Sequence, residues 1–360
     1  MPTLSSQPNP VVIRPGALGD MILLSPLIRR LHQHYGYPCV VIGSGPWCEP
    51  VYRGNPHVAQ VLSLARHEPL PLRVSWWRAR AALRRTDPGP IFICEERRIR
   101  SVNRLLSWSG IDPARCRFLA ERAIEDDTHE VDRLLGLAEH CPPRSPAERE
   151  TPAGASAGTV PFLAVSESER QRCREWIQAR GWGGRPLILI QPGNRRTMSS
   201  RRRRHRRLNR DDKAWPITHW VRLLQDLHAY APSAMLLLCG APREAALLRE
   251  IGRLARLDSV AIAALELRDL LALCECAHSM ISVDTGPAHA AAALGLPLVV
   301  MFGGQPPARW LPRSAASPVS RVGGLPETVR VDQIAVEAVL EAWLRLPSSA
   351  IALACEADLG

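Results

Sequence analysis

The stretch SMISVDTGPAHAAAALGLPLVVMF (Ser279–Phe302) sets the fold class of this 360-residue chain. It begins with an apolar run, Ser279–Val283, continues through a short polar loop into an alanine-rich segment, and ends with a second apolar run, Leu296–Phe302. A buried strand, a helix and another buried strand in this order are typical of a βαβ unit with parallel strands. The small side chains of Ala290–Ala293 would let the helix lie close to the sheet.

The same alternation extends from this unit in both directions. Further strands are predicted at Val11–Arg14, Cys39–Gly43, Val61–Leu64, Ile91–Cys94, Pro186–Ile190, Ala234–Gly240 and Val260–Leu265. Helices are predicted at Met21–Tyr35, His129–His140, Ser168–Arg180, Ile217–Tyr230, Pro242–Ala255, Leu267–Ala277, Pro287–Gly295 and Val331–Leu346. Strands that alternate with helices in this way predict doubly wound α/β units with parallel sheets.

The length of the chain fits two domains better than one. Residues 141–160 are rich in Pro, Ala, Gly and Ser, which is typical of a linker. We therefore predict one domain at 1–150 and a second at 151–330, followed by a helix at 331–346 and a tail at 347–360. The sequence has no long uncharged apolar run and no secretion-type N-terminus, so we expect a cytoplasmic protein whose ten scattered cysteines are free thiols.

Positive charge is concentrated in one part of the chain. The net charge is +11, and nine arginines without any acidic residue lie between Arg195 and Arg210. Such a patch can meet phosphates, nucleic acid or an anionic membrane surface. It can also be a solvated loop that has no dedicated partner.

Lys213 is the only lysine among 46 basic residues. Lysine offers a compact ammonium with three rotatable donors, whereas arginine offers a wide planar fork. A charge that must fit between phosphate oxygens would require lysine at this position. Chance in an arginine-biased composition is the alternative explanation.

Two of the loops that follow predicted strands carry both glycine and a charged residue. In RPGALGD, Gly16 and Gly19 permit a tight turn, and Asp20 is placed either to act in chemistry or to cap the next helix. In the second loop, Gly193 and Lys213 precede a helix that starts near Pro216, and backbone N–H groups with an ammonium would suit a diphosphate.

Two further loops place acids at strand ends. Glu244 could accept hydrogen bonds from ribose hydroxyls, or it could simply favour the dipole of the following helix. The residues after Val283 combine an acid, a hydroxyl and a glycine at a helix start, which indicates an anion or sugar-phosphate site. The candidate residues of this site are Asp284, Thr285, Gly286 and His289.

Taken together, GALGD, DDKAWP, GAPREA and SVDTGPAHAAAALGLP resemble glycosyltransferase family 9, the ADP-heptose:lipopolysaccharide heptosyltransferases. The resemblance covers residues 11–310. It implies a GT-B fold, in which two Rossmann-like domains face each other across a cleft, with the acceptor in the first domain and the nucleotide sugar in the second. The final helix would pack back toward the first domain.

The implied reaction is the inverting transfer of a heptose from ADP-heptose to a lipopolysaccharide core sugar or other glycolipid, without a metal or other cofactor. By resemblance, Asp20 is the base, Lys213 contacts the diphosphate and Glu244 binds the ribose. The resemblance also assigns the donor sugar and phosphates to Asp284, Thr285, Gly286 and His289.

The sequence departs from the family in two places. MFGGQPPARW (Met301–Trp310) replaces a loop that often reads G-P-T-D-P, and the arginine-rich segment is longer than usual. Two other hypotheses therefore stay open: another GT-B enzyme with a different nucleotide sugar, such as a 2-epimerase, or an RNA- or membrane-binding protein using Arg195–Arg210. We expect a monomer without a dedicated nucleic-acid partner. We also expect its arginine patch to hold it on the cytoplasmic face of the inner membrane, with the candidate contacts Arg201, Arg202, Arg203 and Arg204.

Overall fold

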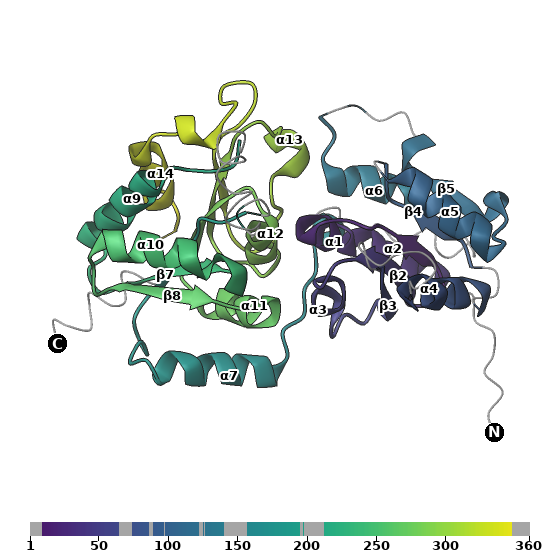
Figure 1. Ribbon diagram of the computed structural model, residues 1–360, viewed down its shortest axis with the longest axis horizontal. Helices are drawn as coiled ribbons and strands as arrows, with labels where there is room; N and C mark the ends of the chain where they lie inside the picture. Colours follow the sequence, from purple (N-terminus) through teal and green to yellow (C-terminus); the bar gives the residue numbers. More distant parts are fainter. Residues whose placement is uncertain are drawn as a thin grey trace. The chain divides into compact units, whose positions relative to one another are not determined.

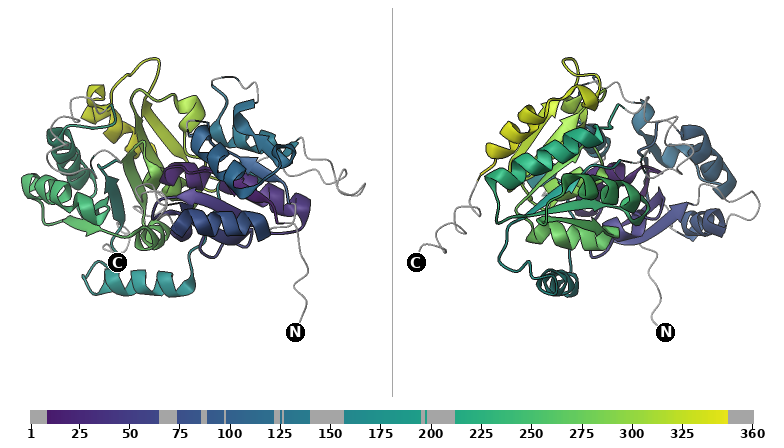
Figure 2. Two further views of the ribbon diagram at one scale, coloured as in Figure 1. Left: turned by 45° about the vertical axis from the view of Figure 1, so that its right-hand side comes forward. Right: turned by 60° about the vertical axis from the view of Figure 1, so that its left-hand side comes forward.

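The computed structural model divides into two compact units, Met1–Ala164 and Val165–Gly360 (Figures 1 and 2). It describes residues 9–64, 74–85, 89–96, 98–121, 125, 127–139, 157–194, 197 and 212–347. Most of the expected linker, almost all of the arginine-rich segment and the tail beyond residue 347 lie outside this part of the chain. The following description treats each unit by itself.

The first unit is built on a five-stranded parallel sheet with the order β3-β2-β1-β4-β5. Its strands are β1 Val11–Ile13, β2 Cys39–Ser44, β3 Val58–Leu64, β4 Ile91–Ile93 and β5 Cys116–Phe118. Its α-helices are α1 Leu18–Leu23, α2 Ser25–Tyr35, α3 Cys48–Tyr52, α4 Val74–Arg85, α5 Ile99–Ser109 and α6 Glu130–Glu139.

Both faces of this sheet are covered, as the apolar composition of its strands requires. Val11 and Ile13 point into a core that also contains Trp76 and Leu83 of α4 and Leu105 of α5. The residues between them on neighbouring strands, such as Val12 and Phe92, are fully buried as well. Because side chains alternate along a strand, a strand buried at every position needs helices on both sides.

The second unit is built on a six-stranded parallel sheet with the order β11-β10-β9-β6-β7-β8. Its strands are β6 Leu187–Gln191, β7 Met235–Gly240, β8 Val260–Ala264, β9 Ser279–Val283, β10 Leu298–Phe302 and β11 Val319–Gly323. Its α-helices are α7 Glu167–Gln178, α9 Ile217–Tyr230, α10 Ala245–Ala255, α11 Leu267–Cys276, α12 Gly286–Ala293, α13 Pro307–Trp310 and α14 Val336–Leu344.

The prediction of two doubly wound parallel units is confirmed. Two strands were not predicted, β5 and β11, and both lie at sheet edges where part of their surface is exposed. Neither sequence, CRF for β5 and VSRVG for β11, has the continuous apolar run that indicates a strand, and an edge strand does not need one. The expected strand at 61–64 begins three residues earlier, at Val58.

The final helix, α14, contributes to the core of the second unit. Val339 and Trp343 are buried in that core, and the indole of Trp343 donates a hydrogen bond to the hydroxyl of Ser279 on β9. These contacts tie α14 to β9, β10 and α9 of its own unit. The packing of this helix toward the first domain, which the resemblance implies, stays a prediction.

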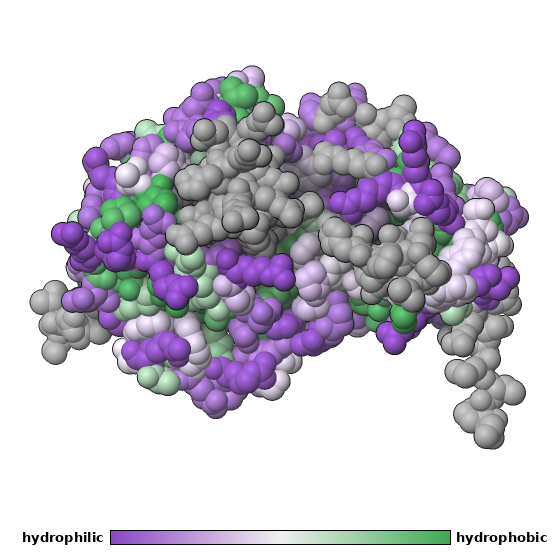
Figure 3. Space-filling model, viewed as in Figure 1, coloured by the Kyte–Doolittle hydropathy of each residue, from purple (hydrophilic) through white to green (hydrophobic). Residues whose placement is uncertain are grey.

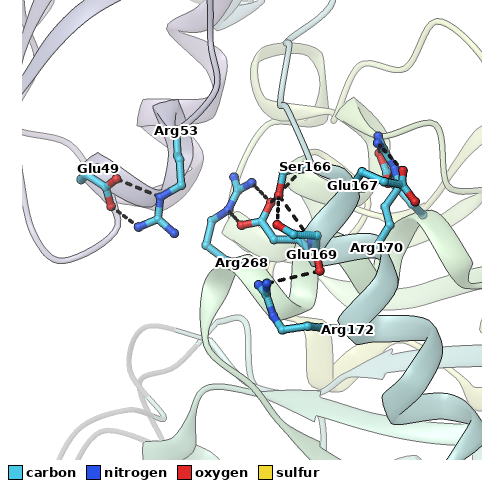
Figure 4. A network of polar contacts seen from close by, with 10 residues as sticks. Glu49, Arg53, Ser166, Glu167, Glu169, Arg170, Arg172 and Arg268 are labelled. Atoms are coloured by element: carbon cyan, nitrogen blue, oxygen red, sulfur yellow. Dashed lines mark hydrogen bonds and ion pairs between the residues drawn. The ribbon is translucent and has the colours of Figure 1, made fainter.

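The start of α7 is fixed by a buried network of charges (Figure 4). The Ser166 hydroxyl accepts a hydrogen bond from the backbone N–H of Glu169, and the Glu169 carboxylate accepts from the backbone N–H of Ser166 at 2.8 Å. Arg268 of α11 donates two hydrogen bonds to the same carboxylate and lowers the pKa of Glu169 to about 2. This bidentate pair locks α7 onto the rest of the second unit.

On the face shown in Figure 3, hydrophobic residues form small patches among hydrophilic ones. Within the described residues, no helix has both the length and the apolar character needed to cross a membrane.

Candidate functional site

The strand order of the second unit defines where a ligand would bind. The chain leaves β6 toward β7 on one side, and β9 lies on the other side of β6. Ligands of open α/β sheets bind at such a reversal, in the crevice beyond the carboxyl ends of the two strands. The loops that leave these ends carry Gly193 after β6 and Asp284 after β9.

Lys213 and Asp284 meet at this reversal. The Lys213 ammonium donates a hydrogen bond to the Asp284 carboxylate and another, at 3.3 Å, to the Asp284 backbone carbonyl. The Asp284 side chain is 7% exposed and that of Lys213 is 27% exposed. The pair lies directly before α12, whose N-terminus carries partial positive charge and outward-facing N–H groups. A positive charge and a helix N-terminus in one place are suited to bind an anion.

The segment that carries Lys213 is held on both sides. The Asp212 carbonyl accepts a hydrogen bond from the backbone N–H of Val331 at 2.9 Å, and the Trp215 indole donates to the Ile334 carbonyl at 2.9 Å. A Cβ at Gly303 would lie 2.2 Å from the Asp212 carbonyl oxygen. Gly303 is therefore a glycine where the backbone of the lysine segment crosses closely over the end of β10.

Gly193 and Glu244 form the second contact at this end of the sheet. Glu244 is 3% exposed, and its carboxylate accepts hydrogen bonds from the Thr197 hydroxyl and, at 3.0 Å, from the Ala241 backbone N–H. Burial raises the pKa of Glu244, while the two hydrogen bonds oppose that rise. Glu244 ends a 3₁₀ turn, Pro242–Glu244, and α10 begins after it at Ala245, so the helix starts later than predicted.

The close contact between Gly193 and Glu244 leads us to predict that a larger residue at position 193 is destabilising. In Gly193→Ala, the new Cβ would lie 1.9 Å from Glu244 Oε1, so the carboxylate must move. We expect a loss of stability of about 1–3 kcal/mol, as for other overpacked sites, and weaker binding of nucleotide. Urea unfolding and titration with ADP measure the two effects. Gly252→Ala is the matched control because its Cβ would approach no atom closer than 3.5 Å; equal behaviour of the two variants would contradict the prediction.

The remaining predicted residues of the second unit lie on the same loop and helix as Asp284. Thr285 is the residue before α12, Gly286 is its first residue, and His289 is buried on its first turns at 5% exposure. The predicted contacts at Arg201, Arg202, Arg203 and Arg204 lie outside the described residues.

In the first unit, the order reverses between β1 and β4, and Asp20 lies just beyond the end of β1. Asp20 is the third residue of α1, and its carboxylate accepts a hydrogen bond from the Ala17 backbone N–H at 2.7 Å. The side chain is nevertheless 29% exposed, so the capping interaction leaves part of the carboxylate open to solvent. A Cβ at Gly16 would lie 2.5 Å from the Asp20 Cβ, which explains the glycine, while Gly19 lies inside α1.

Asp20 is also tied to a buried ion-pair network that the sequence analysis missed. Arg14, at the end of β1, contacts Asp20 at 3.3 Å and Glu130 of α6 at 2.7 Å, and it donates to the Cys94 carbonyl beyond β4 at 3.3 Å. Burial alone would lower the pKa of Arg14, but attraction from Asp20 and Glu130 outweighs it and the pKa is raised. The sequence signals were an arginine that directly follows an apolar strand and an acid that begins the amphipathic helix HEVDRLLGL.

Within the described residues, no group of three or more His, Cys, Asp and Glu side chains is placed to hold a metal ion. Thr197 is a further residue that sequence reasoning missed, because it follows Arg195 and Arg196 in the arginine-rich stretch and carries no motif of its own.

Comparison with known proteins adds family and fold relationships to this geometry. A sequence model described as glycosyltransferase family 9 (heptosyltransferase) matches residues 116–334. No curated protein sequence matches the chain.

Among solved structures, a glycosyl transferase family 9 protein from Veillonella parvula is 15% identical, covers 96% of this chain and 99% of its own, and has a TM-score of 0.69. The ADP-heptose lipopolysaccharide heptosyltransferase II of E. coli is 20% identical, with the same coverage and TM-score. E. coli heptosyltransferase WaaC with ADP is 17% identical, covers 92% of this chain and 98% of its own, and has a TM-score of 0.64. The expected fold class, GT-B with two Rossmann-like domains, is confirmed by these likenesses.

Proposed function

The chain belongs to glycosyltransferase family 9, and from this premise we propose that it transfers a heptose from ADP-heptose to a lipopolysaccharide core sugar or a related glycolipid. We propose that the transfer inverts the anomeric centre and requires no metal. The observation that carries the proposal is the contact between Lys213 and Asp284 before α12, at the strand-order reversal of the second unit.

The second unit is proposed to bind the nucleotide sugar. When the bond between the anomeric carbon and the diphosphate breaks, negative charge develops on the departing ADP. The Lys213 ammonium and the N-terminus of α12 are suited to stabilise that charge, since both are fixed before the reaction begins. Glu244, with hydroxyl and N–H donors already on its carboxylate, is proposed to accept a hydrogen bond from the ribose.

The first unit is proposed to supply the base. The acceptor hydroxyl must lose its proton as its oxygen bonds to the anomeric carbon, and Asp20 is the proposed acceptor of that proton. Attack on the face opposite the departing diphosphate inverts the anomeric configuration. The partial exposure of the Asp20 carboxylate supports this assignment, because a fully capped and buried acid could not reach a substrate.

A donor screen tests the proposal directly. The protein is incubated with ADP-heptose, GDP-sugars and UDP-sugars, and release of nucleotide is measured with and without a heptose-deficient lipopolysaccharide acceptor. Acceptor-dependent release of ADP is expected. Release from another nucleotide sugar would point to a different transferase, and conversion of a sugar nucleotide without transfer would point to an epimerase.

We expect activity to survive EDTA. The charge that a divalent metal would place on the diphosphate is provided here by Lys213 and the α12 N-terminus. The measurement is the transfer rate after dialysis against EDTA, with and without added Mg²⁺, Mn²⁺ or iron. Loss of activity on chelation, restored by one of these metals, would contradict metal independence.

We also expect the arginine-rich segment to bring the enzyme to the anionic cytoplasmic face of the inner membrane, beside its glycolipid acceptor. Each basic residue near such a surface contributes about 1 kcal/mol. Replacing Arg201–Arg204 with serine should weaken binding to anionic vesicles and raise the apparent KM for membrane-bound acceptor, while the Kd for free nucleotide sugar stays constant. A parallel loss of nucleotide-sugar affinity would instead place the segment against the donor.

A further inference from the structure

The outer surface of α4 and α5 in the first unit presents side chains that have no role in the proposed reaction. The two helices contact each other on the same side of the sheet (Figure 1). Trp76, Ala79 and Leu83 of α4 point into the core, so the opposite side of this helix faces outward. That outward side presents apolar residues together with arginines.

Two large apolar side chains are exposed on this surface. Val74 is 58% exposed and Trp77 is 48% exposed. Both lie on the first turn of α4, and within the described residues Trp77 is the one tryptophan among the strongly exposed large apolar side chains. Exposing such a side chain to water is unfavourable, so an exposed tryptophan beside another apolar residue indicates a contact surface.

Trp77 is held in a defined orientation. Its ring meets that of Trp108 on α5 edge to face, with centroids 4.5 Å apart. The Arg80 guanidinium lies 5.4 Å from the Trp77 ring and 4.8 Å from the Trp108 ring, and its Nε donates to the Trp108 carbonyl at 3.0 Å. Because the Trp77 side chain is already held in one orientation, it loses less conformational entropy when it binds a partner.

The surrounding charge is entirely positive along both helices. The sequences of α4 (VSWWRARAALRR) and α5 (IRSVNRLLSWS) contain six arginines and no acidic residue. The exposed arginines of this surface are Arg78, Arg84, Arg100 and Arg104. A helix face with tryptophan and valine among arginines matches the boundary of an anionic bilayer, where the aromatic ring sits at headgroup level and arginines meet phosphates.

We propose that the α4–α5 surface, defined by Val74, Trp77, Arg78, Arg84, Arg100 and Arg104, docks the first unit onto an anionic lipid bilayer. This surface is distinct from the arginine-rich segment of the second unit. A bilayer fits this surface better than RNA for two reasons. The Trp77 ring is already packed against Trp108 and Arg80, and Val74 has neither a ring that can stack on a base nor a polar group that can form a hydrogen bond with it. Insertion of apolar side chains, together with several phosphate contacts, needs no base stacking.

The test uses the full-length protein and vesicles that contain neither donor nor acceptor, so its outcome does not depend on the reaction. Co-sedimentation is measured with phosphatidylcholine vesicles and with vesicles that also contain phosphatidylglycerol. Two variants are compared, Trp77→Ser and the pair Arg78→Gln/Arg84→Gln. Each exposed arginine near an anionic surface contributes about fivefold to binding, so the double variant should bind phosphatidylglycerol vesicles about 25-fold more weakly. Trp77→Ser should also weaken binding to these vesicles. Because the binding that remains would be mainly electrostatic, it should fall more steeply with added salt than that of wild type.

The chain offers a matched control at the C-terminal end of α7 and in the residues that follow it. There, Arg180 lies 4.1 Å from the Trp176 ring, and the rings of Trp176 and Trp182 meet edge to face at 5.3 Å. The chemistry of this cluster is the same, but α7 carries three glutamates among its arginines. Trp176→Ser and Arg174→Gln/Arg180→Gln should therefore leave vesicle binding unchanged.

Two results would overturn the proposal. The α4 variants could bind vesicles as well as wild type, which together with lost binding to RNA would assign the surface to RNA, or the α7 control variants could lose vesicle binding to the same extent. Retained binding in the α4 variants with loss in Arg201–Arg204→Ser would assign the membrane contact to the arginine-rich segment alone.

Discussion

Asp20→Asn is expected to lower the transfer rate by about 10²–10⁴-fold, the range for removal of a general base. An amide cannot take the proton of the acceptor hydroxyl. It can still accept the hydrogen bond from the Ala17 N–H, so the start of α1 should persist. Arg14 keeps its 2.7 Å contact with Glu130, which limits the effect on the buried network. The affinity for nucleotide sugar, which we propose the second unit binds, should stay within a few-fold of wild type.

The control separates the role of a base from that of a cap. Asp112 caps a 3₁₀ turn in the same unit, where its carboxylate accepts a hydrogen bond from the Ala114 N–H at 2.9 Å. Asp112→Asn should leave both kcat and the unfolding midpoint close to wild type. If Asp20→Asn retains substantial transfer and merely loses stability, Asp20 is a helix cap and the base lies elsewhere.

The sequence predicted what depends on local composition. Buried strands such as β7 and β10 are continuous apolar runs, and the loops after β1, β6, β7 and β9 carry the charged residues that stand out against them. Because parallel strands end at one edge of a sheet, knowing the strands was enough to bring Lys213 and Asp284 to the same end. Their direct contact is consistent with that expectation.

The contacts that the sequence did not predict depend on packing between segments that are distant along the chain. Nothing near Arg14 indicates that Glu130, 116 residues later, neutralises it, since this pairing arises only when α6 packs beside the end of β1. The same holds for Gly303, whose role becomes visible only when the Asp212 carbonyl is seen against it. Edge strands β5 and β11 escaped prediction for a related reason, as their neighbours rather than their own sequences stabilise them.

Lys213→Arg is expected to lower kcat by about 10²-fold, although arginine supplies positive charge nearly everywhere else in this chain. The ammonium donates both to the carboxylate and to the backbone carbonyl of Asp284, so it sits within the turn that opens α12. A guanidinium is planar and wider and cannot take the position of a single nitrogen between these two oxygens. The donor Kd should change little, because the charge is retained and long-range attraction of the diphosphate persists.

The backbone cannot move away to make room for the larger group. Asp212 is fixed by the N–H of Val331, and the close crossing at Gly303 leaves no space behind the segment. Lys213→Ala removes the charge as well and should therefore weaken donor binding in addition to kcat. Arg222→Lys is the control for exchanging arginine and lysine. Arg222 lies on the exposed face of α9 beside Asp226, so this variant should leave kcat and the donor Kd unchanged. If Lys213→Arg matches wild type in both kcat and donor Kd, the site does not discriminate between an ammonium and a guanidinium, and the single lysine of the chain is an accident of composition.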